Sequence, residues 1–422
     1  MGVSLNEVSG WGRGNHGGSR ASLSGDGCKG EGMRRKLLAV AVAVVGALAV
    51  VTAVTAHGDR VSVLTPPPPP QPSAVVTYAP AAGANNIGPT DPVSVSVRDG
   101  AFDNVTLTDP AGKQVQGAFN ADRSSWTSSD RLAYGTSYTW DGSAHGRDGA
   151  AVPLQGSVAT IAPAKKTRGT LNIGDGRTVG VAAPIRIQFN QHVADRAAVE
   201  KALKVTTSVP VEGSWGWMPD EGGGSRVDWR PKNYWPTGTT VKVEAQLFGV
   251  NYGEGAWGAS DVSSTFKIGS SQIVKADVNS FRMIVVRDGK QVLDIPASYG
   301  LGSDPERNTR SGVHVVSEKF TDKRMVSQQY GYDVMEKWAV RISNNGEFIH
   351  ANPNSVAAQG SSNVTHGCVN LSIENAKTYY DMAQYGDPVE VTGTPVQLSA
   401  RDGDIWDWTL SWDQWKRMSA LP

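Results

Sequence analysis

A cysteine and two histidines near the carboxyl end of the chain have the types and spacing needed for acyl transfer. Cys368 follows His366 and Gly367, and His350 lies upstream. A thiolate is a strong nucleophile, and a nearby histidine can take the thiol proton. Gly367 permits a tight turn in which successive backbone N–H groups point at one oxygen, as an oxyanion hole requires. These residues indicate a thioester intermediate, with either His350 or His366 as the base.

The position of the second cysteine supports a reactive role for Cys368. Cys28 precedes an uncharged apolar run over residues 37–56, and three basic residues lie directly before that run. This pattern predicts that residues 1–36 are a cytoplasmic tail and that everything after the run lies outside the membrane. The run is long enough to span a bilayer, so we expect a transmembrane anchor, with a signal cleaved after Ala56 as the alternative. An exported Cys368 would then have no disulfide partner.

The same residues admit other interpretations. Three histidines, the third being His314, could bind a metal together with Cys368, but their long irregular gaps match no usual zinc spacing, and we expect no metal. A lone cysteine can also be a small core residue. The chain has 40 basic and 40 acidic residues, so its formal charge is zero. No nucleic-acid partner is expected, because such a partner would need a basic face.

Changes in composition divide the chain into an ordered series of segments. Pro66–Pro70 belongs to a stiff polyproline spacer, and the period-two patterns with short turns that follow are typical of antiparallel β-sandwiches. The predicted fold class is mainly β. The predicted boundaries are a cytoplasmic tail over 1–36, a transmembrane anchor or signal over 37–56, a Pro-rich linker over 57–74, immunoglobulin-like domains over 75–163 and 164–270, a catalytic domain over 271–394 and a C-terminal extension over 395–422.

Two loosely repeated units support the pair of immunoglobulin-like domains. Each contains an alternating strand, a V-x-G-x-aromatic segment, a tryptophan and a Gly-Thr turn into another strand. The segments are Pro92–Val97, Val115–Phe119, Trp126 and Tyr134–Tyr138 in the first unit, and Pro184–Phe189, Val211–Trp215, Trp229 and Thr237–Val241 in the second. We expect their tryptophans to be core residues rather than platforms for glycans: Trp126, Trp140, Trp215 and Trp229. The two domains would then act chiefly as a spacer.

From about residue 271 the pattern predicts a separate β-rich domain. We expect a hairpin with a primed turn at Asp288-Gly289. Further strands are expected over 313–316, 338–342, 346–350 and 389–392. Ser372 can cap a helix from Ile373 to about Tyr385, whose amino end would favour a thiolate at Cys368. The C-terminal extension is rich in tryptophan.

One motif in this domain resembles a known family. His350, fourteen residues and then Thr365-His366-Gly367-Cys368-Val369-Asn370 fit the H-x14-[ST]-H-G-C-x-N signature of L,D-transpeptidases with a YkuD-type catalytic domain. The layout also resembles mycobacterial and related actinobacterial L,D-transpeptidases, which have an anchor, a linker, two immunoglobulin-like domains, the catalytic domain and a Trp-rich C-terminal piece. The resemblance covers most of residues 75–422 and is strongest in the last third.

The resemblance implies a reaction on peptidoglycan stem peptides. Cys368 would attack the carbonyl between meso-diaminopimelate and the terminal D-Ala of a tetrapeptide donor and release D-Ala. The diaminopimelate amine of an acceptor stem would resolve the thioester into a 3→3 crosslink. His350 would be the general base, and His366, Gly367 and Cys368 would shape the oxyanion pocket, with the amides of the latter two as donors. No cofactor is implied, and carbapenem-type β-lactams are expected to acylate Cys368.

The resemblance also assigns supporting residues. Asn370 would steady the loop that carries the cysteine, and Met325 and Tyr332 lie where a flexible lid of the family contacts substrate, although the lid is shorter here. Ala351 stands where family members often have serine after the first histidine. If the family residue orients His350 through its backbone carbonyl, alanine serves equally well.

Three other functions deserve comparison. An L,D-carboxypeptidase would use water as the acyl acceptor, a choice that depends on the shape of the site and on water access. A non-catalytic wall-binding scaffold would use the immunoglobulin-like domains as its working part. A sortase fits poorly, because no arginine downstream of Cys368 is clearly placed to complete a Cys-His-Arg set. For the protein itself, we expect a location in the cell envelope on the extracytoplasmic side.

Overall fold

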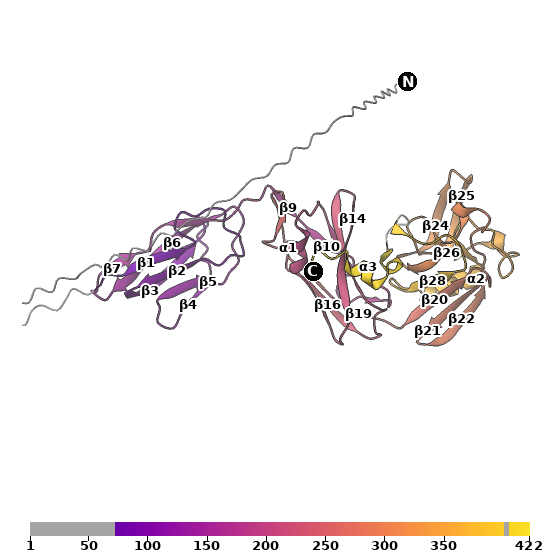
Figure 1. Ribbon diagram of the computed structural model, residues 1–422, viewed down its shortest axis with the longest axis horizontal. Helices are drawn as coiled ribbons and strands as arrows, with labels where there is room; N and C mark the ends of the chain where they lie inside the picture. The colour runs from indigo at the N-terminus through magenta and orange to yellow at the C-terminus, as the bar shows by residue number, and fades with distance from the viewer. Residues whose placement is uncertain (1–71, 401–404) are drawn as a thin grey trace, which may run out of the picture. The chain divides into compact units, whose positions relative to one another are not determined.

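The computed structural model describes residues 72–400 and 405–422, which form a mainly β protein (Figure 1). The predicted tail, the apolar run over 37–56 and most of the Pro-rich linker lie outside the described residues. Within the two described ranges, no helix combines the length and apolarity needed to cross a bilayer.

The first β-sandwich packs two sheets over an aromatic core. One sheet has the order β1-β2-β5-β4, and the other has the order β3-β6-β7, with β8 also paired to β6. The strands are β1 (Val75–Ala79), β2 (Ser94–Arg98), β3 (Gly100–Thr108), β4 (Gly117–Phe119), β5 (Ser125–Ser128), β6 (Ser137–Gly146), β7 (Ala151–Pro153) and β8 (Ser157–Ala159). Alternate residues of β2 are buried, as expected for a strand with one face on the core. Trp126 and Trp140 meet edge to face in that core, with ring centroids 5.5 Å apart.

The second β-sandwich is larger and includes one short helix. Its main sheets have the orders β10-β12-β15-β14 and β11-β19-β16-β13, and a third sheet has the order β17-β18-β9. The elements are β9 (Lys165–Thr167), β10 (Gly169–Leu171), β11 (Thr178–Val179), β12 (Ile185–Phe189), α1 (Arg196–Lys201), β13 (Leu203–Thr207), β14 (Gly213–Glu221), β15 (Gly224–Pro231), β16 (Thr240–Ala245), β17 (Asn251–Gly253), β18 (Ala256–Gly258) and β19 (Val262–Ile268). The Asp195 side chain caps α1 by accepting from Ala198 N.

The repeat seen in the sequence has a physical cause. The sheet orders β1-β2-β5-β4 and β10-β12-β15-β14 correspond strand for strand. In both, the glycine of the V-x-G-x-aromatic segment lies against the tryptophan of the neighbouring strand. A Cβ on Gly117 would come within 2.1 Å of the Trp126 ring, and one on Gly213 within 1.9 Å of the Trp229 ring. Each repeat therefore needs glycine there so that a large buried ring can lie on the backbone, and the prediction of core tryptophans is confirmed.

The third domain holds two sheets and one well-formed helix. A five-stranded sheet has the order β22-β21-β20-β28-β23, and a four-stranded sheet has the order β24-β25-β26-β27. The elements are β20 (Gln272–Asp277), β21 (Arg282–Arg287), β22 (Lys290–Pro296), η1 (Pro305–Arg307), β23 (Gly312–Val315), β24 (Glu318–Ser327), β25 (Tyr332–Arg341), β26 (Phe348–Ala351), η2 (Pro353–Ser355), β27 (Val369–Leu371), α2 (Ile373–Met382) and β28 (Pro388–Thr392). One continuous core joins both sheets and α2.

Several local predictions for this domain are confirmed. Asp288 and Gly289 both have positive φ, as a type I′ turn requires, and they join β21 to β22. The Ser372 side chain caps α2 by accepting from Asn375 N at 3.1 Å. The helix ends at Met382 rather than near Tyr385, because the chain becomes extended at Ala383. The predicted mainly β fold, with two sandwiches before a β-rich domain and a short helix after the cysteine, is confirmed.

The C-terminal extension packs on the second sandwich through tryptophan side chains. It contains η4 (Asp407–Thr409) and α3 (Trp412–Lys416). Trp415 is fully buried, and its indole N–H donates to the Ser214 carbonyl at 2.9 Å. The Arg230 guanidinium of β15 lies 4.7–5.5 Å from the rings of three tryptophans of the extension: Trp408, Trp412 and Trp415. These cation–π contacts bind the end of the chain to the sandwich.

We predict that Trp415→Ala destabilises the second sandwich by about 3–5 kcal/mol, because a large buried ring leaves a cavity behind. Urea unfolding followed by far-UV circular dichroism measures the change. Trp412→Ala is the matched control, since Trp412 lies three residues away and is only half-buried. Equal destabilisation by the two substitutions would contradict the prediction.

Candidate active site

A parallel pairing of two short strands brings the histidine and the cysteine of the motif together. Strand β26 carries His350 and strand β27 begins directly after Cys368, and His350 lies opposite Asn370 in the register. Parallel strands cannot be joined by a tight turn, so the chain needs a long crossover between them. Residues 352–368 form that crossover, which contains most of the motif's gap and has η2 near its start.

The loop before β27 is held by hydroxyl groups. The Thr365 hydroxyl donates to the Cys368 carbonyl at 2.6 Å and accepts from Gly367 N at 3.2 Å. The Thr309 hydroxyl donates to the Gly367 carbonyl at 2.8 Å. Gly367 has φ +114°, a conformation that favours glycine. The serine or threonine and the glycine of the motif therefore fix the shape of this turn and the position of the cysteine.

Arg307 secures the same loop from its other side. Its guanidinium donates to the Val364 carbonyl at 2.7 Å and to the Thr365 carbonyl at 3.2 Å. These bonds are charge-assisted and span a gap of more than fifty residues in the chain, so they fix the loop against η1. Arg307 precedes Cys368 in the chain, and both of these guanidinium donors bind backbone carbonyl groups.

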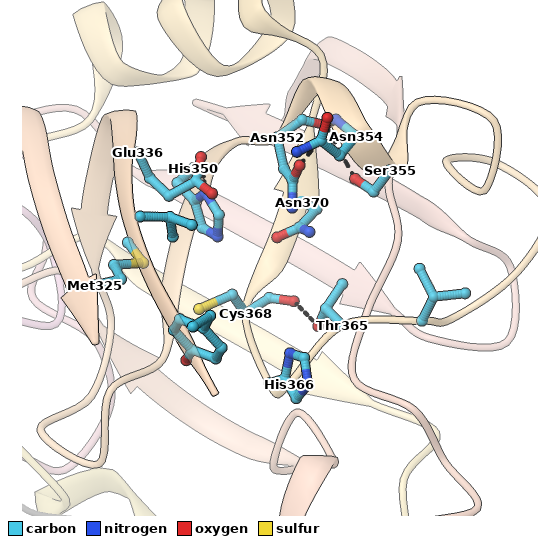
Figure 2. Close-up of a pocket in the computed structure, with 13 residues that line it drawn as sticks. Met325, Glu336, His350, Asn352, Asn354, Ser355, Thr365, His366, Cys368 and Asn370 are labelled. Carbon is cyan, nitrogen blue, oxygen red and sulfur yellow. Dashed lines mark hydrogen bonds and ion pairs between the residues drawn. The ribbon is translucent and has the colours of Figure 1, made fainter. Parts of the chain in front are cut away.

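His350 is buried and oriented by a backbone carbonyl. Its Nδ1 lies 2.9 Å from the Ala351 carbonyl oxygen, so Nδ1 donates there and Nε2 is the ring atom left for Cys368. Figure 2 shows the His350 ring directed toward the Cys368 sulfur. The thiol also donates to the Gly346 carbonyl at 3.5 Å. Alanine at position 351 thus supplies the oriented acceptor through its main chain.

The surroundings of His350 favour its protonated form. Burial by itself would lower the pKa, but the neighbouring Cys368 and Glu336 outweigh burial and raise the pKa of His350 to about 10. The nearest Glu336 carboxylate oxygen lies 3.6 Å from Nδ1. An imidazolium that faces a sulfur favours the thiolate and can later release its proton.

Two cavities meet at Cys368. One has a volume of about 290 Å³ and contains His350, Glu336 and Asn370 in its wall. The other has a volume of about 370 Å³ and extends beneath the tip of the β24–β25 hairpin. Four residues line both cavities: Met325, Tyr332, His366 and Cys368. A reacting carbonyl at the sulfur would therefore be accessible from two directions.

The segment expected to be a flexible lid is a β-hairpin in this structure. Strands β24 and β25 pair in register from Glu318↔Arg341 to Ser327↔Tyr332. Met325 lies opposite Val334, and the Tyr332 ring lies 5.3 Å from the His366 ring. Burial and the adjacent Cys368 raise the pKa of Tyr332. The sequence pattern predicted a strand over 338–342, which covers the end of β25, but it predicted no strand at the position of β24.

His366 and His350 lie on different sides of Cys368 (Figure 2). The His366 ring is exposed and stacks with Tyr330 at 4.5 Å. Partial burial and the charge of Arg307 lower the pKa of His366, so its ring is neutral at pH 7. Of the two histidines that the residues alone left open as the base, His350 has the fixed orientation and the contact with the thiol.

Asn370 combines a fixed main chain with a free side-chain oxygen. Its backbone pairs with Ser298, through N–H···O bonds of 2.8 and 3.1 Å. Its side chain lines the first cavity, and the buried Oδ1 has no hydrogen-bond partner among the described residues. A buried unpaired acceptor in a cavity wall suits a donor on a bound peptide.

Two expected sources of electrostatic stabilisation can be located in the structure. The Gly367 amide donates to the Thr365 hydroxyl at 3.2 Å. The Gly367 and Cys368 amides remain the predicted donors to an oxyanion. The amino end of α2 is also separated from Cys368 by all of β27, roughly 10 Å at the usual rise per residue, and the effect of a helix dipole is confined to its first turn.

A buried acidic residue supports the strand that carries His350. Glu347 accepts from Arg310 N and the Ser343 hydroxyl, each at 2.9 Å. His314 is fully buried, and its Nδ1 lies 3.6 Å from the same carboxylate. Glu347 directly follows Gly346, whose carbonyl accepts from the thiol. His314 is therefore structural, and no group of three or more possible metal ligands occurs in the described parts of the chain.

Sequence reasoning missed four residues that shape this site. Arg307, Thr309 and Glu336 lie well before the motif in the chain, and Glu347 lies three residues before His350. Glu336 had one detectable signal, because Tyr332, Val334 and Glu336 alternate along one strand and all line the first cavity. The other three act on backbone groups that only the folded chain brings near.

Comparisons with known proteins agree with the fold. Residues 84–251 match the family described as "Bacterial Ig domain", and residues 271–391 match the "L,D-transpeptidase catalytic domain", termed YkuD. Two sandwiches followed by this domain define a multidomain protein of the YkuD class.

Individual relatives show which family of this class the chain resembles. The chain is 54% identical to L,D-transpeptidase 5 of Mycobacterium tuberculosis over 352 residues, which are 83% of this chain and 78% of that protein. It is 38% identical to L,D-transpeptidase 2 of the same species over 347 residues, 80% of this chain and 83% of that protein. A solved structure of the LD transpeptidase LdtMt1 in complex with imipenem covers 55% of this chain and 100% of its own, at 31% identity and a TM-score of 0.46. The chain belongs to the L,D-transpeptidase family.

We predict that Gly367→Ala lowers the rate of acyl transfer roughly 10–100-fold, because small displacements of reacting groups have effects of this size. A Cβ at position 367 meets only ordinary contacts, the nearest being Asn308 O at 3.5 Å, so the effect comes from backbone strain of about 1–2 kcal/mol. The rate of thioester formation measures the change. Gly302→Ala is the control, since Gly302 has open space around its Cα. An unchanged rate in Gly367→Ala would contradict the prediction.

Proposed function

We propose that this protein is an envelope L,D-transpeptidase that forms 3→3 crosslinks in peptidoglycan through a thioester on Cys368. The observation that carries the proposal is the oriented pair at the cavity wall, with His350 Nδ1 fixed on the Ala351 carbonyl and its ring facing the sulfur. The donor is a tetrapeptide stem, and the acceptor is the diaminopimelate amine of a second stem. The chemistry needs no metal or organic cofactor.

The proposed reaction has two half-reactions. The Cys368 thiolate attacks the carbonyl between diaminopimelate and D-Ala, and the oxyanion that forms is stabilised by the Cys368 amide. The C–N bond breaks while the His350 imidazolium donates its proton to the departing amine, which leaves as D-Ala. The acceptor amine then attacks the thioester, His350 takes the proton from that amine, and the C–S bond breaks to regenerate the thiolate.

The two cavities support transpeptidation over hydrolysis. Both are lined by Cys368, and they share Met325, Tyr332 and His366 in their walls. A donor in one cavity would leave the other for the acceptor stem, and Tyr332 and Met325 would contact substrate at the junction. Asn370 would accept a hydrogen bond from the bound peptide through its buried Oδ1. An L,D-carboxypeptidase would need only one such cavity with access for water.

The remaining parts of the chain fit the same proposal. We divide it as the sequence predicts, with domains at 75–163, 164–270 and 271–394 and an extension from 395. The two sandwiches act as a spacer, consistent with their buried tryptophans. The apolar run at 37–56 would anchor the protein in the plasma membrane and hold the site on the extracytoplasmic side. Carbapenem-type β-lactams would acylate Cys368, because their strained carbonyl suits the same nucleophile.

We predict that the full-length protein converts purified disaccharide-tetrapeptide into a dimer that lacks one D-Ala, as measured by mass spectrometry. Cys368→Ala should give no such dimer, because it removes the thiol that His350 faces. A tripeptide monomer as the sole Cys368-dependent product would favour the L,D-carboxypeptidase. Absence of any Cys368-dependent product would overturn the proposal in favour of a wall-binding scaffold.

A second prediction concerns position 351. Ala351→Ser should change turnover by about threefold or less, well under 1 kcal/mol, because the carbonyl that orients His350 belongs to the main chain and is retained. Turnover is measured with the same dimer assay, and His350→Ala provides the reference for a lost histidine. A tenfold rise in Ala351→Ser would mean that a hydroxyl at this position contributes to catalysis.

A further inference from the structure

An acidic side chain in the first cavity stands out from its surroundings. Among the described residues that line this cavity, Glu336 is the one carboxylate, and its side chain is 14% exposed. Its nearest oxygen lies 3.6 Å from Nδ1 of His350, whose side chain is 4% exposed. Burying a charged carboxylate away from water costs free energy unless a positively charged partner offsets that cost. For Glu336, the positively charged partner in contact is the imidazolium of His350.

The fold of β25 aims Glu336 at the histidine. Tyr332, Val334 and Glu336 alternate on the face of the strand that lines the cavity. Two residues later, Trp338 has φ +55°, a left-handed conformation that is uncommon for a bulky residue inside a strand. This kink separates the part of β25 that pairs with β26 from the part that covers the cavity. Strained residues persist where the surrounding packing enforces them, and Trp338 packs against Tyr380 with ring centroids 5.3 Å apart.

Other charged and titratable groups surround the pair. Cys368 faces the opposite side of the His350 ring, and Tyr332 and His366 lie further along the cavity wall. Lys323 is directly opposite Glu336 in the hairpin register, but its Nζ lies 4.3 Å from the centre of the Phe320 ring. The histidine is therefore flanked by one group that becomes anionic and by one carboxylate, while its Nδ1 also lies 2.9 Å from the Ala351 carbonyl oxygen.

We propose that Glu336 is a positioning residue that holds His350 as an imidazolium, so that the resting enzyme is a thiolate–imidazolium–carboxylate triad. The neutral Ala351 carbonyl sets the direction of the ring, and Glu336 supplies the charge. The proton needed by the leaving amine is then already on His350 when substrate arrives. This inference rests on the proposed transpeptidase function and adds a charged third member to its catalytic pair.

The sign of the pH effect follows from the pKa of His350. That pKa is raised to about 10, so the imidazolium is retained from acidic pH up to that value and is lost only above it. Removing the negative charge of Glu336 lowers the pKa, by about one to two units for an opposite charge at this distance. The imidazolium is then lost at lower pH, and the alkaline limit of the reaction moves toward neutrality.

We predict this shift in the acylation of Cys368 by a carbapenem, a reaction that uses no acceptor amine. The full chain carries Cys28→Ser so that Cys368 is the single thiol, and the second-order rate constant is measured by mass spectrometry from pH 5 to pH 11. Glu336→Gln should move the alkaline limit down by about one to two pH units. Glu336→Asp, which keeps the charge, should restore part of that shift. Glu318→Gln removes a carboxylate from the same hairpin outside the cavity and should leave the profile unchanged.

Alkylation of Cys368 by iodoacetamide on the same four proteins provides a second measurement. The reagent needs a thiolate but no proton donor. The alkylation rate of Glu336→Gln should therefore reach its plateau at a higher pH than the rate of the parent chain. A uniform loss of rate at every pH, with an unshifted profile, would mean that Glu336 is merely structural and would overturn the proposal. An unchanged acylation profile with impaired dimer formation would instead assign Glu336 to the acceptor amine and would also overturn it.

These outcomes are separable from the fate of the proposed function. Complete inertness of Cys368 toward both reagents in the parent chain would refute a reactive pair and the triad together. A parent chain that is acylated but makes no dimer would leave the triad supported by its pH profile while overturning transpeptidation. Dimer formation with no difference between Glu336→Gln and Glu318→Gln would overturn the triad alone.

Discussion

The parallel pairing of β26 with β27 is the constraint on which the site depends. It places His350 next to Asn370 and leaves Cys368 directly before the paired part of β27, so that main-chain hydrogen bonds fix the histidine and the end of the turn that carries the nucleophile. Ser298 extends this arrangement by pairing with Asn370 on the other side of β27. Sites built on strands hold their geometry more closely than sites built on loops. The turn that carries Cys368 is the irregular part, and Thr365, Thr309 and Arg307 hold it there.

The electrostatics of the site follow from burial combined with specific contacts. His350 is almost inaccessible to solvent, which on its own would favour a neutral ring, yet its contacts with Cys368 and Glu336 reverse that preference. His366 is exposed and near Arg307, and its pKa moves the other way. The pKa values of the two histidines of one motif thus shift in opposite directions, because His350 faces Cys368 and Glu336 whereas partial burial and the charge of Arg307 act on His366. Their chemical roles are separated by environment and not by residue type.

A different constraint shapes the two sandwich domains that precede the site. In these domains, large aromatic rings pack directly against the backbone at glycine positions. Gly117 lies under Trp126 and Gly213 lies under Trp229, so the two sandwiches share the same contact at these positions. The C-terminal extension uses the same kind of contact, since Gly216 of the second sandwich makes room for the ring of Trp415. Aromatic residues that an unfolded chain would expose become the attachment between the last segment and the second sandwich. Burying such rings contributes strongly to stability.

The sequence by itself determined the mainly β fold, the two related sandwiches, the capped helix after the cysteine and the residues of the reactive motif. These features depend on local periodicity, turn chemistry and the spacing of a few residue types, all of which are properties of neighbouring positions. Only the tertiary structure decided which histidine contacts the thiol, that the presumed lid is a hairpin, and that Gly367 N is already engaged by Thr365. It alone brought Glu336, Glu347, Thr309 and Arg307 to the site. Contacts between residues distant in the chain depend on strand register and sheet order, and in this domain both are set by a core assembled from two sheets and a helix.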